Sequence, residues 1–303
     1  MTEGPSRAPS APVQSLSPSQ AQALAERYGL TRLGTRPPLG RYVRDLWRRR
    51  SFLWTLSSAQ SYARNHDNRL GQLWQLLNPA LLIGSYFLIF GVLLGTTGSV
   101  SNRVGFLSIG VILFAYTSSV ITRGAKSITS NLGLVRGLRF PRAVLPLSVT
   151  LTELIAATPA FGLLLVVMLV TGETPSLRWL LLPVAILLQT GILAGLAFIG
   201  ARVVNASKDL GQLIPVVVRL LRYTSGVFFP VAQYAERLPG IWGDVLVYQP
   251  FALPLEAARQ SLMSSQDHPF DLTTWWALAA WSIALLAIGL VIFWRDEAKY
   301  GRG

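Results

Sequence analysis

Residues 123–146 read R-G-A-K-S-I-T-S-N-L-G-L-V-R-G-L-R-F-P-R-A-V-L-P and join two long apolar segments of the chain. This stretch, called the basic loop below, carries five basic residues and no acid. Loops rich in Lys and Arg between membrane helices stay on the cytoplasmic side. A short helix is predicted in its middle, capped between Ser127 and Ser130 and ended before Pro141, because the residue before a proline avoids helical geometry.

The charge of the basic loop is open to two interpretations. In the first, a soluble motor docks on the loop and moves the membrane helices on either side of it. In the second, the loop is an ordinary cytoplasmic connection whose charge orients the chain in the membrane. The composition and the charge distribution of the remaining chain bear on this choice.

The composition is that of an all-α polytopic membrane protein. Of its 303 residues, 51% are apolar and 14% are charged, and the sequence shows no strand alternation of the barrel type. Several uncharged runs reach the ~20 residues that cross a bilayer as a helix. The chain has no cysteine, so disulfides and thiol chemistry are excluded.

The net charge of +13 is unevenly placed along the chain. Residues 1–73 contain eleven Arg and four acids, whereas residues 234–271 contain two Arg and five acids. This segregation is typical of membrane orientation, and it argues against a nucleic-acid partner. We therefore expect a multi-pass protein of the plasma membrane with both termini in the cytoplasm.

Six apolar segments are predicted to cross the membrane. Their ranges are 73–95, 104–122, 145–170, 179–201, 212–230 and 272–294, and they form a predicted transmembrane domain over residues 73–303. The first segment is predicted to kink or break at Asn78-Pro79. Residues 231–271 are apolar but interrupted by prolines and glycines, which predicts two outer re-entrant helices covered by protein.

The region before the first segment is predicted in two parts. Residues 1–40 are expected to form a flexible tail with one short helix over 19–28, and residues 41–72 a cytoplasmic region. An amphipathic helix is predicted over 41–56, with apolar residues on one face and arginines on the rest. Such a helix is typical of the headgroup layer, and a helix that binds a soluble partner is the alternative.

The fifth apolar segment carries a polar stripe at helical spacing. Its members are Gln212, Pro215, Arg219, Arg222, Tyr223 and Gly226. An arginine at the centre of a membrane helix costs about 2.5–3.5 kcal/mol, so it should face water or a partner. We expect Arg219 and Arg222 to line a conduit for an anionic group such as phosphate. Snorkelling to the headgroups, or pairing with Glu153 of the third segment, is the alternative.

Enzyme and metal motifs are not supported. Ala125-Lys126-Ser127 resembles the end of a phosphate-binding loop, but Ala125 stands where that motif requires glycine. The two histidines, His66 and His268, are far apart in the sequence, and Glu153 has no second acid inside a predicted segment. We therefore expect a protein that is not an enzyme and binds no metal.

Four stretches carry a resemblance to a known family. They are N-R-L-G-Q-L-W-Q-L-L-N-P at 68–79, N-L-G-L-V-R-G-L-R-F-P-R-A-V-L-P at 131–146, S-K-D-L at 207–210 and F-F-P at 228–230. In them the chain resembles the membrane subunit of ABC-2 type polysaccharide exporters, which export lipid-linked O-antigen, teichoic acid or galactan. A-E-R-Y-G-L-T-R-L-G at 25–34 resembles actinobacterial members that export cell-wall galactan.

The resemblance implies an assembly and a substrate. Two copies of the chain, in the ABC-2 or type V exporter fold, would pair with two ATPase subunits that bind ATP and Mg²⁺, so this chain would hold no cofactor. The basic loop would contain a coupling helix over 126–139, and the helix over 41–56 would frame a cytoplasmic entrance. The first and fifth segments would border a channel for a polyprenyl-diphosphate-linked glycan, closed outside by residues 231–271.

The resemblance and the residue patterns together give three predicted groups of site residues. The ATPase would contact Lys126, Ser127, Asn131, Arg136, Arg139, Phe140, Pro141 and Arg142. The channel would be lined by Arg219, Arg222, Tyr223, Tyr86, Phe90, Tyr116 and Phe228, although aromatic residues are also common as packing and interface anchors. The entrance would be formed by Arg44, Trp47, Arg48, Arg49 and Arg50.

Two other functions remain open from the sequence. The first is an ABC-2 permease for a drug or a lipid. The second is a membrane enzyme that acts on polyprenyl phosphates, which would need acids or histidines facing the cytoplasm near a membrane helix.

Overall fold

The computed structural model describes residues 17–28, 38–63, 73–89, 102–137, 140–264, 266, 268–297 and 300. All regular structure in these residues is helical, which confirms the predicted all-α class. The chain divides into two units, and the first, residues 1–36, contributes the helix α1, Pro18–Arg27. This helix was predicted over 19–28. Most of the predicted tail lies outside the described residues.

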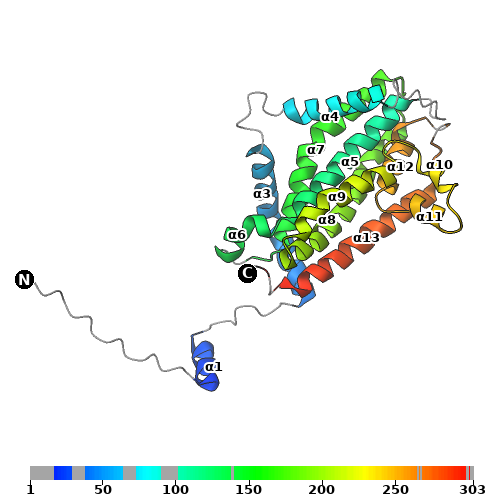
Figure 1. Ribbon diagram of the computed structural model, residues 1–303. Helices are drawn as coiled ribbons and strands as arrows, with labels where there is room; N and C mark the ends of the chain where they lie inside the picture. Colours follow the sequence, from blue (N-terminus) through cyan, green and yellow to red (C-terminus); the bar gives the residue numbers. More distant parts are fainter. Residues whose placement is uncertain are drawn as a thin grey trace, which may run out of the picture. The chain divides into compact units, whose positions relative to one another are not determined.

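Four helices of the second unit are long and apolar enough to cross a membrane. They are α5 (Arg103–Ala125), α7 (Val144–Val170), α8 (Leu182–Ala206), which continues from the 3-10 turn η3 (Leu177–Leu181), and α13 (Leu272–Arg295). Figure 1 shows α5, α7, α8 and α13 side by side as the body of this unit. Their bounds confirm the second, third, fourth and sixth predicted segments.

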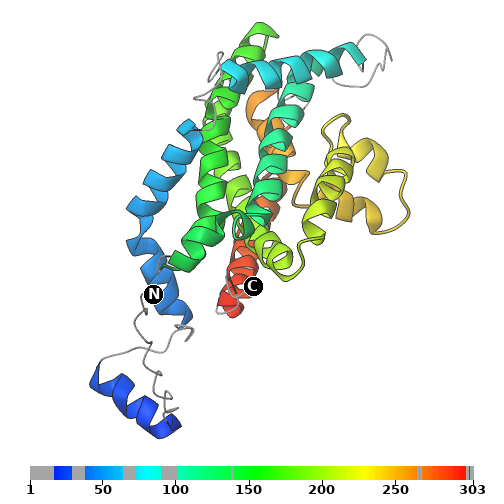
Figure 2. The same cartoon turned by 60° about the vertical axis from the view of Figure 1, so that its left-hand side comes forward.

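The first and fifth predicted segments are shorter than expected in the described residues. Helix α4, Leu73–Tyr86, runs through Pro79 without the break that the sequence suggested, and it lies across α5 and α7 (Figures 1 and 2). Helix α9, Leu210–Thr224, ends before Gly226, whose φ of 79° turns the chain. Neither helix alone reaches the ~20 residues of a full span, so the count of six spans stays a prediction.

Three short helices follow α9 where the sequence predicted two. They are α10 (Val231–Ala235), α11 (Trp242–Val247) and α12 (Leu253–Leu262). Helices α10 and α11 pack on each other, whereas α12 is buried against α5, α8 and α13. A re-entrant helix must be buried in protein rather than exposed to lipid, and α12 meets this requirement.

The single amphipathic helix predicted over 41–56 is two helices. Helix α2, Leu39–Arg48, and helix α3, Arg50–Ala63, are separated at Arg49, where φ is −92° and ψ is 14°. The buried residues of this region are Tyr42, Ser57 and Ser61, while Trp47 and Trp54 are 70% and 59% exposed. The two tryptophans of the predicted apolar face are therefore turned outward, as a helix in the headgroup layer requires, whereas Leu46 packs on the core. Helix α3 packs on α7.

Helices α8 and α13 approach each other through glycines. A Cβ on Gly195 would overlap the backbone of Leu285, and a Cβ on Gly289 would overlap the carbonyl of Gly195. Small residues allow such close backbone contact between membrane helices. Because these two helices form the most extensive helix pair in the unit, this contact fixes the position of α13.

We predict that Gly289→Ala lowers the thermal unfolding midpoint of the purified protein in detergent. The added methyl group must push α8 and α13 apart, and overpacking of this kind costs ~1–3 kcal/mol. The matched control is Gly162→Ala on α7, because no atom lies within 4 Å of a Cβ at that position. Equal midpoints for the two variants would show that the close contact between α8 and α13 is not real.

Candidate functional site

The basic loop contains the predicted short helix. After α5 ends, the chain forms the 3-10 turn η2, Thr129–Asn131, and the helix α6, Leu132–Gly137. The hydroxyls of Thr129 and Ser130 donate to the carbonyl of Lys126 at 3.1 and 2.7 Å. The same carbonyl also accepts the backbone N–H of Ser130 at 2.9 Å, so three donors meet at the end of α5. The local sequence T-S-N therefore shapes the turn into α6.

The side chains of the basic loop divide into exposed and packed groups. Lys126 and Arg136 are exposed, and Ser127 is buried. The ring of Phe140 packs against Phe52 of α3, with centroids 6.2 Å apart. Arg139 lies outside the described residues. The exposed cations are therefore at the start of the loop and on α6, where a partner could reach them.

The end of the basic loop is held by a partly buried network that we call the polar anchor, formed by Tyr42, Arg142, Glu297 and Tyr300. Glu297 accepts hydrogen bonds from the hydroxyl of Tyr42 at 2.6 Å and from the backbone N–H of Arg142 at 2.9 Å. The guanidinium of Arg142 donates to the carbonyls of Glu297, at 2.6 Å, and of Tyr300. The anchor thus joins α2, the loop and the chain after α13.

The electrostatics of the polar anchor follow from its burial. Burial raises the pKa of Glu297 above the usual range of a carboxyl, and the Tyr42 hydroxyl and Arg142 act in the opposite direction. Burial, and then the charge of Glu297, raises the pKa of Tyr42. The Tyr42 hydroxyl therefore stays protonated near neutral pH and acts as a donor to the carboxylate.

Three members of the polar anchor, Tyr42, Glu297 and Tyr300, were not among the site residues predicted from the sequence. Tyr42 lies 255 residues from Glu297 in the chain, so no local pattern connects them. Arg142 was expected to contact an ATPase, but its guanidinium is turned inward onto backbone carbonyls. An acid directly after the last apolar segment was the one signal that could have suggested an internal partner for the loop.

The start of the basic loop is held by an ion pair. Arg123, in the last turn of α5, contacts Glu153 of α7 at 3.1 Å. The Glu153 side chain is 4% exposed and that of Arg123 is 48% exposed. Glu153 is therefore the partner of Arg123, and the alternative in which it pairs with Arg219 or Arg222 is wrong. A buried carboxylate is stable in such a place because it is paired.

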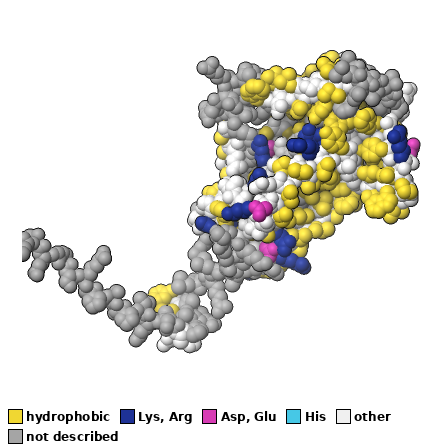
Figure 3. All heavy atoms as spheres, in the orientation of Figure 1, with side chains coloured by type: hydrophobic (Ala, Val, Ile, Leu, Met, Phe, Trp, Pro, Cys, Tyr) yellow, Lys and Arg dark blue, Asp and Glu magenta, His cyan; other side chains and the backbone are white. Residues whose placement is uncertain are grey.

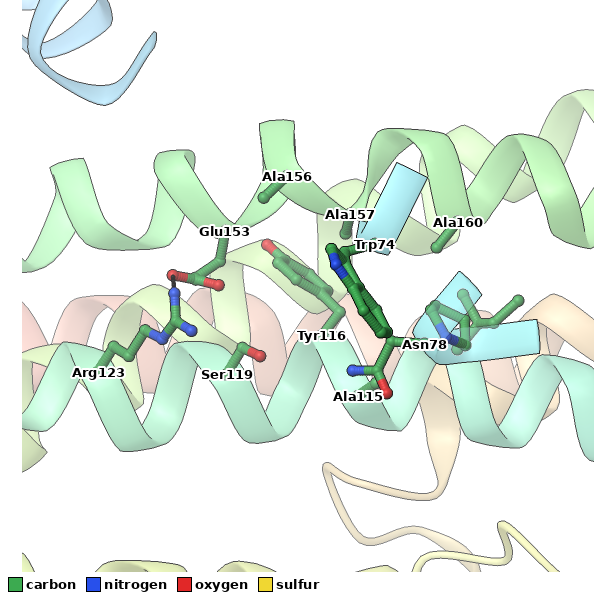
Figure 4. A pocket seen from close by; sticks show the side chains of 12 residues that line it. Trp74, Asn78, Ala115, Tyr116, Ser119, Arg123, Glu153, Ala156, Ala157 and Ala160 are labelled. Atoms are coloured by element: carbon green, nitrogen blue, oxygen red, sulfur yellow. Dashed lines mark hydrogen bonds and ion pairs between the residues drawn. The ribbon is translucent and has the colours of Figure 1, made fainter. Parts of the chain in front are cut away.

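A cavity of about 290 Å³ lies next to this ion pair, between α4, α5 and α7. Figure 4 shows Trp74 and Asn78 of α4, Tyr116 of α5 and the ion pair around it. Tyr116 itself is buried, and its hydroxyl lies 2.9 Å from that of Thr190. Of the predicted channel residues, Tyr116 is thus the one that borders this cavity.

Four other predicted channel residues, together with Phe114, form a separate group that we call the arginine–aromatic cluster. The four predicted members are Tyr86, Arg222, Tyr223 and Phe228. Arg222 donates to the Tyr86 hydroxyl at 3.2 Å and lies 5.4 Å from the centre of the Phe114 ring. Phe228 contacts the rings of Tyr86 and Tyr223 at 4.9 and 5.6 Å. Arg219 is exposed on α9 outside this cluster, and Phe90 lies outside the described residues.

The surface around these sites is strongly apolar. Figure 3 shows hydrophobic side chains over much of the face formed by α9, α11 and α13. Large exposed side chains on these helices include Val216 and Leu220 of α9, Trp242 of α11, and Trp276 and Ile283 of α13. Such a surface is stable against lipid and not against water. Within the part of the chain that the structure describes, no group of three His, Cys, Asp or Glu could hold a metal ion.

The family model described as ABC-2 type transporter matches residues 51–263, which include nearly all of α3, the helices from α4 to α12, the basic loop and the arginine–aromatic cluster. Tyr42, Glu297 and Tyr300 of the polar anchor lie outside the matched residues. The chain belongs to the ABC-2 type transporter family. It is therefore an all-helical integral membrane protein of a transport family, and the predicted resemblance is confirmed at this level.

Three relatives show how far this ABC-2 chain matches other proteins. It is 28% identical over 253 residues to the O-antigen export system permease protein RfbA of Myxococcus xanthus, covering 84% of this chain and 95% of the relative. It is 25% identical over 238 residues to the RfbA protein of Klebsiella pneumoniae, covering 78% and 88%. It is 26% identical over 243 residues to the polysialic acid transport protein KpsM of Escherichia coli, covering 76% and 88%.

We predict that Tyr42→Phe destabilises this ABC-2 chain. The change removes the hydrogen bond to Glu297 Oε2, and it leaves the backbone N–H of Ala143, which donates to the Tyr42 hydroxyl at 3.1 Å, without this acceptor. Leaving buried polar groups unsatisfied costs ~1–3 kcal/mol, which thermal unfolding of the purified protein measures. The control is Tyr248→Phe, because Tyr248 is 38% exposed. A Tyr42→Phe midpoint as high as that of the control would contradict the polar anchor.

Proposed function

We propose that this chain is the membrane permease subunit of an ABC exporter that moves a lipid-linked polysaccharide out across the plasma membrane. A separate ATPase subunit supplies the energy by binding ATP and Mg²⁺, and two permeases assemble with two ATPases. The observation that carries the proposal is a basic loop fixed to membrane helices at both ends, in a chain whose relatives are named as O-antigen and polysialic acid export proteins.

The attachment of the basic loop suits the transmission of force. At its start, the pair of Arg123 and Glu153 ties the loop to α7. At its end, the polar anchor ties it to α2 and to the chain after α13. A push on the loop therefore reaches several helices at once, because both of its ends are bonded to other parts of the chain. In this proposal the loop and both termini are cytoplasmic, as the positive charge predicts.

The ATPase subunit in this proposal docks on the exposed side of the loop. Lys126 and Arg136 supply charge there, and the neighbouring members of the predicted group are Ser127, Asn131, Arg139, Phe140, Pro141 and Arg142. Arg142 contributes indirectly, because its backbone N–H and guanidinium bind Glu297 and so hold the loop in place. The arginines around Trp47 on α2 and α3 lie at the headgroup level, where they frame the entrance for an anionic lipid.

The arginine–aromatic cluster supports a glycan as the transported group. Aromatic rings offer flat apolar faces to sugar rings, and a guanidinium binds phosphate and hydroxyl groups. Arg222 is kept in place by Tyr86 and Phe114, so its orientation is fixed before a ligand arrives. Within this class the polyprenyl-diphosphate-linked galactan of a cell wall is the specific candidate that the sequence resemblance implies.

The proposal is tested by depleting the chain in its host and supplying variants. Depletion should cause lipid-linked polysaccharide to accumulate on the inner side of the membrane, and the wild-type chain should restore its export. Arg219→Ala with Arg222→Ala should reduce export by about tenfold or more, because a hydrogen bond to a charged group contributes ~1.5–3 kcal/mol. Membrane assembly, measured by the amount of chain that purifies with the ATPase subunit, should be unchanged.

The control is Arg237→Ala, which removes one exposed arginine from the segment between α10 and α11. It should restore export fully. Depletion that leaves lipid-linked polysaccharide at its normal level and location would refute the proposed function. Full export by the double variant would refute the role of the arginines on α9.

A further inference from the structure

Two cavities share the ion pair of Arg123 and Glu153 as a common wall. The first, called the aromatic cavity, is the one of about 290 Å³ that Trp74 and Tyr116 border (Figure 4). The second, called the basic cavity, has a volume of about 400 Å³ and lies between α3, α7 and the start of the basic loop. Gln60, Lys126 and Asn131 line the basic cavity together with the ion pair.

The guanidinium of Arg123 has N–H donors that its contact with Glu153 does not use. One guanidinium nitrogen, Nη1, contacts Glu153 Oε1, and a guanidinium carries five N–H donors in a planar fork. The side chain of Arg123 is 48% exposed, whereas that of Glu153 is 4% exposed. Glu153 therefore holds one nitrogen of the guanidinium beside both cavities, and the other N–H groups can bind a second acceptor.

Lys126 makes the charge of the basic cavity positive. It follows Arg123 by three residues at the end of α5, and residues at this spacing lie on the same side of a helix. The two cations face one acid, Glu153, so one positive charge is not compensated among the residues lining this cavity. The carbonyl of Lys126, which would repel an anion, already accepts hydrogen bonds from Thr129 and Ser130.

The aromatic cavity offers a different surface on the other side of the ion pair. In Figure 4 Trp74, Asn78 and Tyr116 lie around the space between α5 and α7. Trp74 is 43% exposed, so a face of its indole ring can be covered by a ligand. An aromatic surface with amide and hydroxyl groups beside it is suited to a sugar ring, since a sugar has an apolar face and a polar rim.

We propose that this pair of cavities binds the head of the lipid-linked glycan, with a diphosphate in the basic cavity and the adjoining sugar in the aromatic cavity. Arg123 binds the diphosphate through its planar fork and Lys126 adds a second positive charge. Glu153 is the positioning residue for Arg123. This inference rests on the proposed function and adds a loading site beside the basic loop, so that a bound substrate touches the first residues of the element that the ATPase pushes.

A purely structural role for Arg123 makes a different prediction. If Arg123 serves to neutralise Glu153, removal of Arg123 leaves a buried carboxylate without its partner and destabilises the protein. Changing both residues to glutamine removes both charges together. In this case the double change should restore both the stability of the protein and its binding of ligand. If Arg123 binds a diphosphate, the double change restores stability but not binding. The variant pair Arg123→Gln with Glu153→Gln therefore separates the two roles.

The experiment measures binding of farnesyl diphosphate to the purified full-length chain in detergent, with farnesol and inorganic pyrophosphate as separate ligands. We expect the wild-type chain to bind farnesyl diphosphate, and the double variant to bind at least about tenfold more weakly, the loss expected for one charge-assisted contact. Thermal unfolding should show the double variant near the wild-type midpoint. Arg237→Gln, an exposed arginine outside both cavities, should bind like wild type.

Each result decides one part of the proposal. Wild-type affinity in the double variant, or no binding of farnesyl diphosphate by the wild-type chain, overturns the diphosphate site. Pyrophosphate binding as tight as that of farnesyl diphosphate assigns the site to free phosphate compounds and overturns the lipid-linked ligand. This binding assay involves no transport, so a failure of the proposed export function would be seen separately, in the depletion experiment, and would not be confused with failure of the site.

Discussion

The structure depends on the pairing of two carboxylates, one buried and one partly buried, with the ends of one basic loop. Glu153 on α7 holds Arg123, and Glu297 after α13 holds the backbone of Arg142 and the hydroxyl of Tyr42. A carboxylate placed among apolar helices is stable when its charge and its lone pairs are satisfied by other groups. The same contacts that satisfy these acids also fix the loop to the helices. One set of bonds therefore stabilises the carboxylates and connects the loop mechanically to the rest of the chain.

The long apolar helices could be predicted from the sequence, and the contacts between distant segments could not. Uninterrupted apolar runs define α5, α7 and α13 to within a few residues, because helix length in a bilayer is set by its thickness. The separation of α2 from α3 at Arg49 and the early end of α9 depend on local geometry that hydrophobic spacing does not encode. The spacing on α9 pointed to Arg222 and Tyr223, but their partners Tyr86 and Phe228 come from other parts of the chain.

The sites lie along a path from the basic loop toward the other end of the bundle. Arg123 is in the last turn of α5, Tyr116 lies two turns earlier beside the aromatic cavity, and Phe114 contacts Arg222 in the arginine–aromatic cluster. In our proposal α5 connects the element that receives force with the groups that meet the glycan. The exposed apolar surface of α9 and α13 leaves lipid, or a second copy of the chain, as the surroundings of this path.

The central claim is that force enters through the basic loop, and cross-linking to the ATPase subunit tests it most directly. Because the natural chain contains no cysteine, a single introduced thiol reports on one position. Arg136→Cys on α6 should form a cross-link with the ATPase subunit through a short bifunctional thiol reagent, and Ile241→Cys, next to α11, should not. A cross-link at position 241 with none at position 136 would contradict the account.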